Sequence, residues 1–185
     1  MRTFIAIPLE AECRSMLDKM EQGLRSCGAE VGWVAIPSIH LTLKFLGEVD
    51  PEIIPKLAEF LEAASEPEHG FELRLRGLGC FPNQKGPRVI WCGIEGDADA
   101  LLKLQLKVER ACNEFGFPPE DRSFKPHLTL GRVKGKRNLQ PLIDYIKIGS
   151  DLESSFRVGH YNIYRSTLKP QGAIYGVVRT ITLRE

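Results

Sequence analysis

The chain lacks the features that mark a membrane protein or a protein that coats a polyanion. None of its hydrophobic runs approaches the roughly 18 residues that a membrane helix needs, and its first residues lack the apolar stretch of a signal peptide. We therefore expect a cytoplasmic protein with no membrane partner. Its 25 Lys and Arg residues nearly balance its 24 Asp and Glu residues. This balance argues against both a histone-like DNA coat and an acidic disordered protein.

Cysteine and histidine are both scarce. The five cysteines form an odd set without a Cys-x-x-Cys pair, so the sequence indicates neither a disulfide framework nor a zinc ribbon. Reduced thiols in a hydrophobic core are the better interpretation. The four histidines and the acidic residues form no compact set typical of a two-metal phosphatase. We therefore expect no metal and no cofactor.

Hydrophobic periodicity predicts more strands than helices in a chain that is 43% hydrophobic. The expected helices cover residues 9–27, 50–64, 101–115 and 139–148. The expected strands cover residues 3–9, 31–36, 40–46, 71–76, 89–94, 127–133, 156–165 and 173–183. Several adjacent strands have connections too short for parallel crossovers. The sequence therefore predicts an α+β fold with mainly antiparallel sheets.

One tetrapeptide, His-Leu-Thr-Leu, occurs twice, at residues 40–43 and 127–130, and uses two of the four histidines. The spacing is too long for a small solenoid unit and fits two copies of a half-domain. We therefore expect a single domain over residues 1–185 that consists of two pseudo-symmetric lobes. Each lobe carries one motif, and a central cleft lies between the two.

Strand geometry gives these motifs a chemical meaning. Residues i and i+2 of a strand face the same side, so each motif presents His and Thr together while its leucines face the core. Hydrolysis of a phosphodiester requires a base for the attacking water and an acid for the leaving oxygen. Histidine, with a reference pKa of about 6.5, supplies both forms near neutral pH. Threonine hydroxyls can donate hydrogen bonds to the non-bridging oxygens.

Other interpretations of these residues remain open. The two histidines alone are also compatible with structural, hydrogen-bonded side chains, and the threonines with ordinary strand residues. Lys44 shares the face of the first motif by period two, where it either borders the cleft or points into solvent. A basic stretch at Lys134, Lys136 and Arg137 either follows RNA phosphates or is a solvated loop.

The two motifs and their flanks resemble a known family. The segments that carry the resemblance are Arg-Thr-Phe-Ile-Ala-Ile at 2–7, His-Leu-Thr-Leu-Lys-Phe-Leu-Gly at 40–47 and Ser-Thr-Leu-Lys-Pro-Gln-Gly-Ala-Ile-Tyr at 166–175. Over nearly its whole length the chain is similar to RNA 2′,3′-cyclic phosphodiesterases of the two-histidine (2H) phosphoesterase superfamily, in its LigT-like branch. The resemblance implies a bilobal α+β fold and a metal-independent site that opens 2′,3′-cyclic phosphates to 2′-phosphates. It also implies the reverse reaction, 2′,5′ RNA ligation.

The resemblance also implies roles for individual residues. His40 would be the proton donor to the leaving 3′ oxygen, and His127 would be the base that activates water. Thr42 and Thr129 would hold phosphate oxygens, and Arg132 would lie against the phosphate. Strict strand alternation turns Arg132 away from His127, so we expect the strand to end or twist there.

The expected partners are RNA ends or nucleotides that carry a 2′,3′-cyclic phosphate, bound by a monomer. Phe4 matches the aromatic residue of the family's first strand, and it either approaches the base or lies in the core. One rival function is a 2H enzyme that acts on a cyclic ADP-ribose phosphate or a 2′,5′-linked oligonucleotide. Another is an RNA-end binding module without turnover. Two intact His-Thr pairs argue against a module that only binds.

Overall fold

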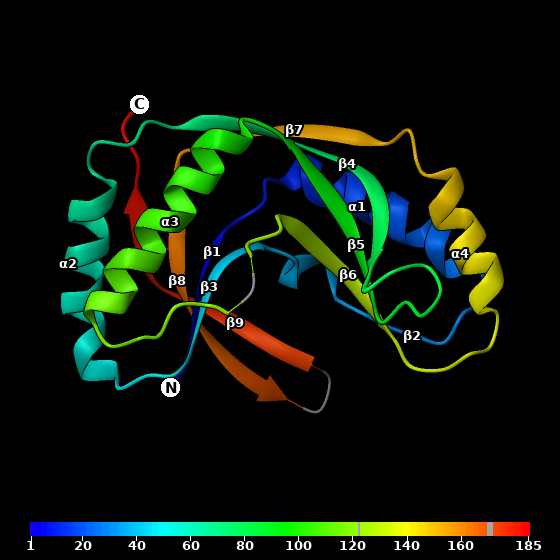
Figure 1. Cartoon of the computed structure of the whole chain (residues 1–185), viewed down its shortest axis with the longest axis horizontal. Helices are drawn as coiled ribbons and strands as arrows, with labels where there is room; N and C mark the ends of the chain where they lie inside the picture. The colour runs from blue at the N-terminus through cyan, green and yellow to red at the C-terminus, as the bar shows by residue number, and fades with distance from the viewer. Residues whose placement is uncertain (122, 170–171) are drawn as a thin grey trace.

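Two β-sheets form the centre of the computed structural model, which describes residues 1–121, 123–169 and 172–185 (Figure 1). The first sheet has the order β3-β1-β8-β9, and the second sheet has the order β2-β6-β5-β4-β7. Every pairing between these strands is antiparallel, which confirms the predicted α+β class. The strands are β1 (Arg2–Ile7), β2 (Val31–Trp33), β3 (Leu41–Glu48), β4 (Phe71–Phe81), β5 (Val89–Gly96), β6 (His127–Val133), β7 (Glu153–Val158), β8 (His160–Lys169) and β9 (Gly172–Thr182).

The described residues form four α-helices, which cover the sheets in pairs (Figure 1). They are α1 (Ala11–Ser26), α2 (Ile54–Ser65), α3 (Ala98–Glu114) and α4 (Leu139–Ile148). Helices α2 and α3 pack on the first sheet, and α1 and α4 pack on the second. Yet α1 follows β1 of the first sheet, and α3 follows β5 of the second. Each of these two helices therefore covers the sheet to which its preceding strand does not belong.

Helix boundaries follow local capping signals. The Asp50 carboxylate accepts a hydrogen bond from the Glu52 amide, and a short 3-10 turn, Pro51–Ile53, precedes α2. Asp97 caps α3 in the same way by accepting from the Ala100 amide. After the end of α3, Gly116 adopts a φ of +84°, a conformation that glycine tolerates without strain.

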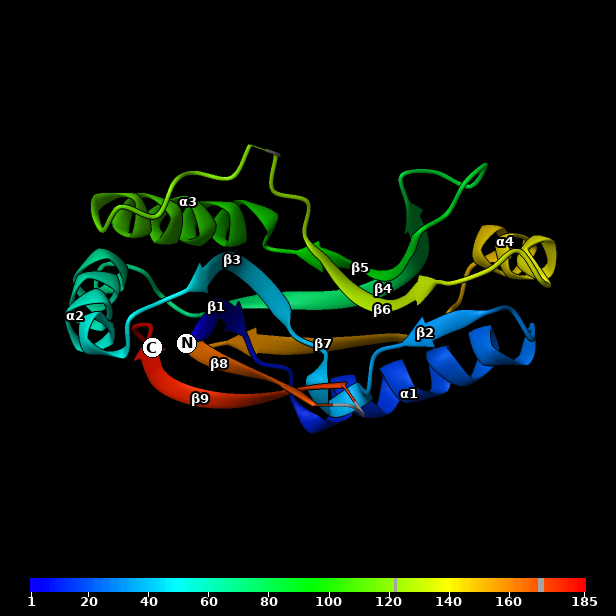
Figure 2. The same ribbon diagram turned by 90° about the horizontal axis from the view of Figure 1, so that it is seen from below.

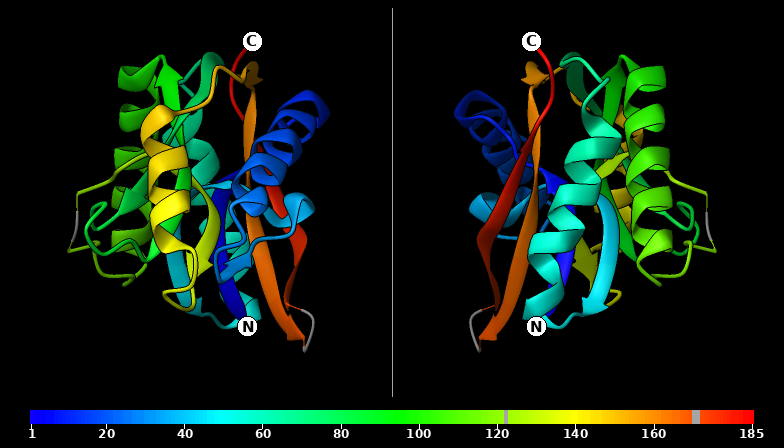
Figure 3. Two further views of the ribbon diagram at one scale, coloured as in Figure 1. Left: turned by 90° about the vertical axis from the view of Figure 1, so that its right-hand side faces the viewer. Right: turned by 90° about the vertical axis from the view of Figure 1, so that its left-hand side faces the viewer.

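The two sheets have matching topologies. The order β3-β1-β8-β9 corresponds to β6-β5-β4-β7, and β2 is an additional strand beyond β6. In chain order, β1–α1–β3–α2 corresponds to β5–α3–β6–α4. The motif strands β3 and β6 therefore occupy equivalent places in the two sheet orders. The N- and C-termini lie in the half of the molecule that carries α2, at opposite edges of it (Figures 1 and 3).

Three predicted strands differ from the observed ones. The predicted strand at 156–165 is wrong, because β7 and β8 are separate strands that belong to different sheets and meet at Gly159. Periodicity cannot show this change of sheet, since both strands bury one face. Strand β2 is shorter than predicted, and Ile36–Ser38 form a 3-10 turn where Pro37 lacks an amide hydrogen for a ladder. Strand β4 is longer and reaches Phe81.

A continuous hydrophobic core joins the sheets and helices. It contains the motif leucines, Leu41, Leu43, Leu128 and Leu130, each at most 3% exposed. All five cysteines are free thiols, as predicted, and all but the half-buried Cys27 are buried. No helix of the described ranges is long and apolar enough to span a membrane.

Candidate active site

The two motifs lie close together at the junction of the sheets. His40 immediately precedes β3, and His127 is the first residue of β6. Cα atoms of β3 and β6 approach within 8 Å, and Figure 2 shows these strands next to one another. Thr42 and Thr129 are half-buried, between leucines that are buried. The alternation predicted for both motifs is therefore present from the His to the second Leu.

Both imidazoles are held by the same local contact. The Nδ1 atom of His40 lies 2.9 Å from the Ser38 carbonyl oxygen, and that of His127 lies 2.6 Å from the Lys125 carbonyl oxygen. A carbonyl oxygen only accepts hydrogen bonds, so each Nδ1 carries a proton. The Nε2 atom of each ring is then the nitrogen left for proton transfer, as a base when neutral and as an acid when protonated.

The aromatic surroundings of His40 restrict its ring. Phe4 stacks on it with a centroid distance of 4.5 Å, and Tyr175 contacts it edge-on at 5.1 Å. Phe4 in turn stacks on Tyr164 at 5.1 Å. Phe4 is only 3% exposed and its ring supports that of His40. It lies outside the continuous hydrophobic core, and an approach of this ring to the base stays a prediction.

His127 has a different aromatic neighbour. Phe81, the last residue of β4, contacts the His127 ring edge-on at 5.0 Å and Trp91 at 5.3 Å. Sequence patterns do not identify Phe81 as a site residue, because it lies far from the motif in the chain and adjoins a segment that resembles an ordinary loop. The antiparallel ladder of β4, β5 and β6 brings it to the histidine.

Burial affects the titration of His40. Removal of its ring from water lowers the pKa of His40 below the usual 6.5, and the hydrogen bond to the Ser38 carbonyl acts in the opposite direction. The free protein therefore favours the neutral imidazole at this position.

The first motif contains a β-bulge. Ala6 of β1 pairs with Thr42, but the adjacent Ile5 pairs with Lys44, so Leu43 is an extra residue in β3. A bulge shifts the alternation of side chains by one position. Leu43 and Lys44 consequently both point into the interior.

The second motif contains a bulge at the same position. Trp91 pairs with Thr129 and Ile90 pairs with Gly131, so Leu130 is the extra residue in β6. Beyond it, Arg132 pairs with Val89, which lies on the same face of β5 as Trp91.

Arg132 therefore shares a face with Thr129 and His127, and its side chain is exposed. Of the two expected alternatives, an end of the strand or a twist, the first is wrong, because β6 continues to Val133. The bulge at Leu130 redirects the arginine instead. Bulges with this effect are common beside active sites.

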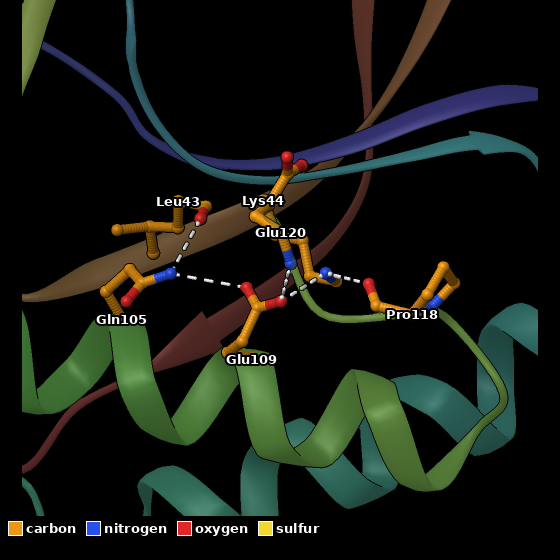
Figure 4. A network of polar contacts seen from close by, with 6 residues as sticks. All are labelled: Leu43, Lys44, Gln105, Glu109, Pro118 and Glu120. Carbon is orange, nitrogen blue, oxygen red and sulfur yellow. Dashed lines mark hydrogen bonds and ion pairs between the residues drawn. The ribbon is translucent and has the colours of Figure 1, made fainter. Parts of the chain in front are cut away.

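Both interpretations of Lys44, at the cleft or in solvent, are wrong. The bulge turns this side chain inward, where it is 2% exposed. Its Nζ donates to Glu109 Oε1 at 2.6 Å and to the Pro118 carbonyl at 2.9 Å (Figure 4). A buried ammonium requires such partners, because an unpaired charge in the interior is costly.

Glu109 is the centre of a polar network that includes the first motif strand. Its carboxylate also accepts from the Glu120 amide at 2.9 Å and from Gln105 Nε2 at 3.3 Å. Gln105 Nε2 lies 3.5 Å from the carbonyl of the bulged Leu43 (Figure 4). The network thus connects the first motif to α3 and to the segment that precedes the second motif.

The predicted basic stretch and the predicted central cleft are the remaining surface features of the site. Arg137 of the basic stretch lies 3.6 Å from Glu30 in an exposed ion pair, while Lys134 and Lys136 are exposed. A concavity of about 460 Å³ lies between β9 and the start of α2 and is lined by neither motif histidine. The central cleft therefore stays a prediction. Within the described ranges, no group of three or more His, Cys, Asp or Glu side chains is placed to hold a metal ion.

Comparison with known proteins gives consistent matches. Residues 32–169 match the family model described as the 2'-5' RNA ligase superfamily. An Aeropyrum pernix protein named RNA 2′,3′-cyclic phosphodiesterase is 37% identical over 160 residues, which cover 86% of this chain and 90% of that protein. A crystal structure of a Thermus thermophilus protein has a TM-score of 0.84 and 30% identity, and the match covers 100% of this chain and 98% of that one. For E. coli LigT complexed with 3′-AMP, the TM-score is 0.81 and the identity 25%, with the same coverage.

Proposed function

Because the chain belongs to the 2'-5' RNA ligase superfamily, we propose that it is a phosphodiesterase that opens RNA 2′,3′-cyclic phosphates with His40 and His127. The observation that carries this proposal is the matched pair of imidazoles. Both are held through Nδ1 by a carbonyl two residues earlier. Their motif strands belong to different sheets but approach within 8 Å of one another. In-line opening of a cyclic phosphate needs one acid and one base, and an imidazole can serve as either.

The reaction follows from this arrangement. His127 Nε2 accepts a proton from water as the water oxygen bonds to phosphorus, and the bond between phosphorus and the 3′ oxygen breaks. His40 Nε2 donates its proton to the departing 3′ oxygen, which leaves a 2′-phosphate and a 3′-hydroxyl. The hydroxyls of Thr42 and Thr129 and the guanidinium of Arg132 stabilise charge on the non-bridging oxygens. Ligation to a 2′,5′ bond follows the same steps with a 5′-hydroxyl as the nucleophile in place of water: the 5′ oxygen bonds to phosphorus, and the 3′ oxygen again leaves and takes the proton.

The phosphate itself prepares His40 for its role. An acid must be protonated, whereas burial lowers the pKa of His40 in the free protein. A bound cyclic phosphate carries one negative charge, and an anion near the ring favours the imidazolium form. Substrate binding therefore raises the pKa of His40.

We expect this shift to separate two pH profiles. Both should be bell-shaped, with apparent pKa values that belong to the coupled pair. The kcat/KM profile describes the free enzyme. Because the pKa of His40 is lowered there, this acid loses its proton early as the pH rises, and the alkaline limb of kcat/KM lies at comparatively low pH. The kcat profile describes the complex, and its alkaline limb should lie at higher pH. Initial rates on adenosine 2′,3′-cyclic phosphate from about pH 5 to 9 measure both profiles. An alkaline limb of kcat at the same or lower pH would contradict the proposed protonation.

Turnover should be independent of divalent metal and should yield only the 2′-phosphate. The acid, the base and the phosphate-binding groups are all proposed to be side chains of this chain. The test is incubation of EDTA-treated protein with an oligonucleotide that ends in a 2′,3′-cyclic phosphate, followed by separation of the phosphate isomers. A 2′,5′-linked oligonucleotide in a parallel reaction tests the rival substrate. Activity that EDTA abolishes and a divalent ion restores would refute the mechanism. A 3′-phosphate product would show that the cyclic phosphate binds in the opposite orientation, with its 2′ oxygen as the leaving group.

A further inference from the structure

Phe81 is the aromatic residue that lies against His127 in the second sheet. Its ring contacts the His127 ring edge-on, with a centroid distance of 5.0 Å. Both rings are half-buried, and neither Phe81 nor its neighbour Trp91 belongs to the continuous hydrophobic core. Packing of the core therefore does not account for the place of the Phe81 ring. Its effect on the histidine is the informative feature.

A single hydrogen bond leaves the His127 ring incompletely fixed. Its Nδ1 atom donates to the Lys125 carbonyl oxygen at 2.6 Å, but the ring can still tilt about that bond, and a tilt moves Nε2. Proton transfer requires Nε2 within hydrogen-bond reach of the attacking water. The contact with Phe81 restricts the tilt, because edge-to-face aromatic pairs prefer a defined mutual orientation.

Phe81 also contacts the residue that accepts this hydrogen bond. The Lys125 ammonium lies over the Phe81 ring, 5.9 Å from its centroid. At this distance a cation is attracted to the face of an aromatic ring. One phenyl ring thus contacts both the His127 ring and the side chain of the residue whose carbonyl orients it. It thereby holds the imidazole relative to the backbone that precedes β6.

Phe81 is itself held by a tryptophan on the neighbouring strand. Trp91 of β5 pairs with Gly79 of β4 on one side and with Thr129 of β6 on the other. The rings of Trp91 and Phe81 are 5.3 Å apart. The indole occupies the space next to Gly79, where an added Cβ atom would clash with it. A glycine in a strand often marks such a close approach, and here it leaves room for the indole beside the motif strand.

We propose that Phe81 is a positioning residue for the base of the reaction. The space at Gly79 seats Trp91, and Trp91 supports Phe81. Phe81 in turn fixes the His127 ring and with it the direction of Nε2. This inference rests on the proposed function, in which His127 is the base. Phe81 touches no reacting atom in this role, so its whole contribution to the rate passes through His127.

The test is a double-mutant cycle between Phe81 and His127. Phe81→Leu keeps an apolar side chain but removes the aromatic ring. With adenosine 2′,3′-cyclic phosphate it should lower kcat roughly 10- to 100-fold, the scale for a misplaced catalytic group, and change KM by less than about twofold. In the His127→Ala background the same substitution should change kcat by less than about twofold, because no base remains to be positioned. Phe81→Tyr, which keeps the ring, should retain most of the wild-type kcat.

Two glycine substitutions supply a second route to the same effect and a matched control. Gly79→Ala displaces Trp91 without altering Phe81 itself, and it should lower kcat as Phe81→Leu does. Gly86 lies in the loop between β4 and β5, where an added Cβ atom meets no other segment of the described chain within 4 Å. Gly86→Ala should leave kcat and KM unchanged. Circular dichroism checks folding, and Phe81→Met replaces Phe81→Leu if the leucine variant is unfolded.

The positioning role makes three results incompatible with it. These are an equal loss of kcat in both backgrounds of the cycle, no loss when His127 is present, and a raised KM at unchanged kcat, which would assign Phe81 to direct substrate binding. Wild-type protein without turnover would refute the proposed function instead. In that case the NMR signals of the His127 ring nitrogens, assigned with His127→Ala, decide the inference. A single Nδ1–H tautomer that becomes a mixture of tautomers in Phe81→Leu supports it, and identical signals overturn it.

Discussion

Replacement of either motif histidine by alanine should lower kcat by about 10²-fold or more, the usual scale for a positioned acid or base. Each ring has its Nδ1 bonded to a carbonyl oxygen, so its contribution to the reaction passes through a single nitrogen, Nε2, that alanine removes. The KM should change less than kcat, because proton transfer belongs to the transition state. The measurement is kcat of His40→Ala and His127→Ala on adenosine 2′,3′-cyclic phosphate, with folding checked by circular dichroism.

The other two histidines of the chain are the controls. His69 and His160 are both exposed and belong to neither motif, so their alanine variants should keep wild-type kcat. The double variant of His40 and His127 should be little slower than the slower single variant, because the two groups act on one transition state. Wild-type turnover by either single motif variant would disprove the assignment of these histidines.

Replacement of Lys44 by methionine should destabilise the protein by about 3–5 kcal/mol, the range for breaking a buried ion pair at one partner. The substitution leaves the Glu109 carboxylate, whose side chain is 14% exposed, with hydrogen bonds but without its cation. Replacement of both Lys44 and Glu109 by methionine should recover much of this loss, because no unpaired charge then remains. The shift of the urea unfolding midpoint at constant m-value measures both effects.

Glu30→Gln is the control for this prediction. It breaks the ion pair with Arg137, whose two side chains are 41% and 70% exposed. Solvent screens such a pair, so the substitution should cost at most about 1 kcal/mol. Equal midpoints for Lys44→Met and Glu30→Gln would show that the buried network around α3 does not stabilise the fold.

The sequence alone determined the elements that depend on local patterns. The predicted strand at 127–133 and the predicted helix at 139–148 have the bounds of β6 and α4. Capping by Asp50 and the burial of the motif leucines also agree with prediction. Side-chain periodicity and capping act over a few residues, so the sequence contains them directly. The repeated His-Leu-Thr-Leu indicated acid-base chemistry on a phosphodiester for the same reason, because its alternation places His and Thr on one face of each strand.

Only the tertiary structure decided which side chains join those histidines. Whether Leu43 is an extra residue depends on the pairing of β3 with β1, a contact between distant parts of the chain. That bulge buries Lys44 and exposes Phe45, the reverse of what alternation predicts for these two positions. In the same way, the strand pairing of the second sheet brings Phe81 to His127. Helix α3 follows a strand of the second sheet but packs on the first sheet. Register and helix placement are set by the energy of packing the whole chain, which no local pattern records.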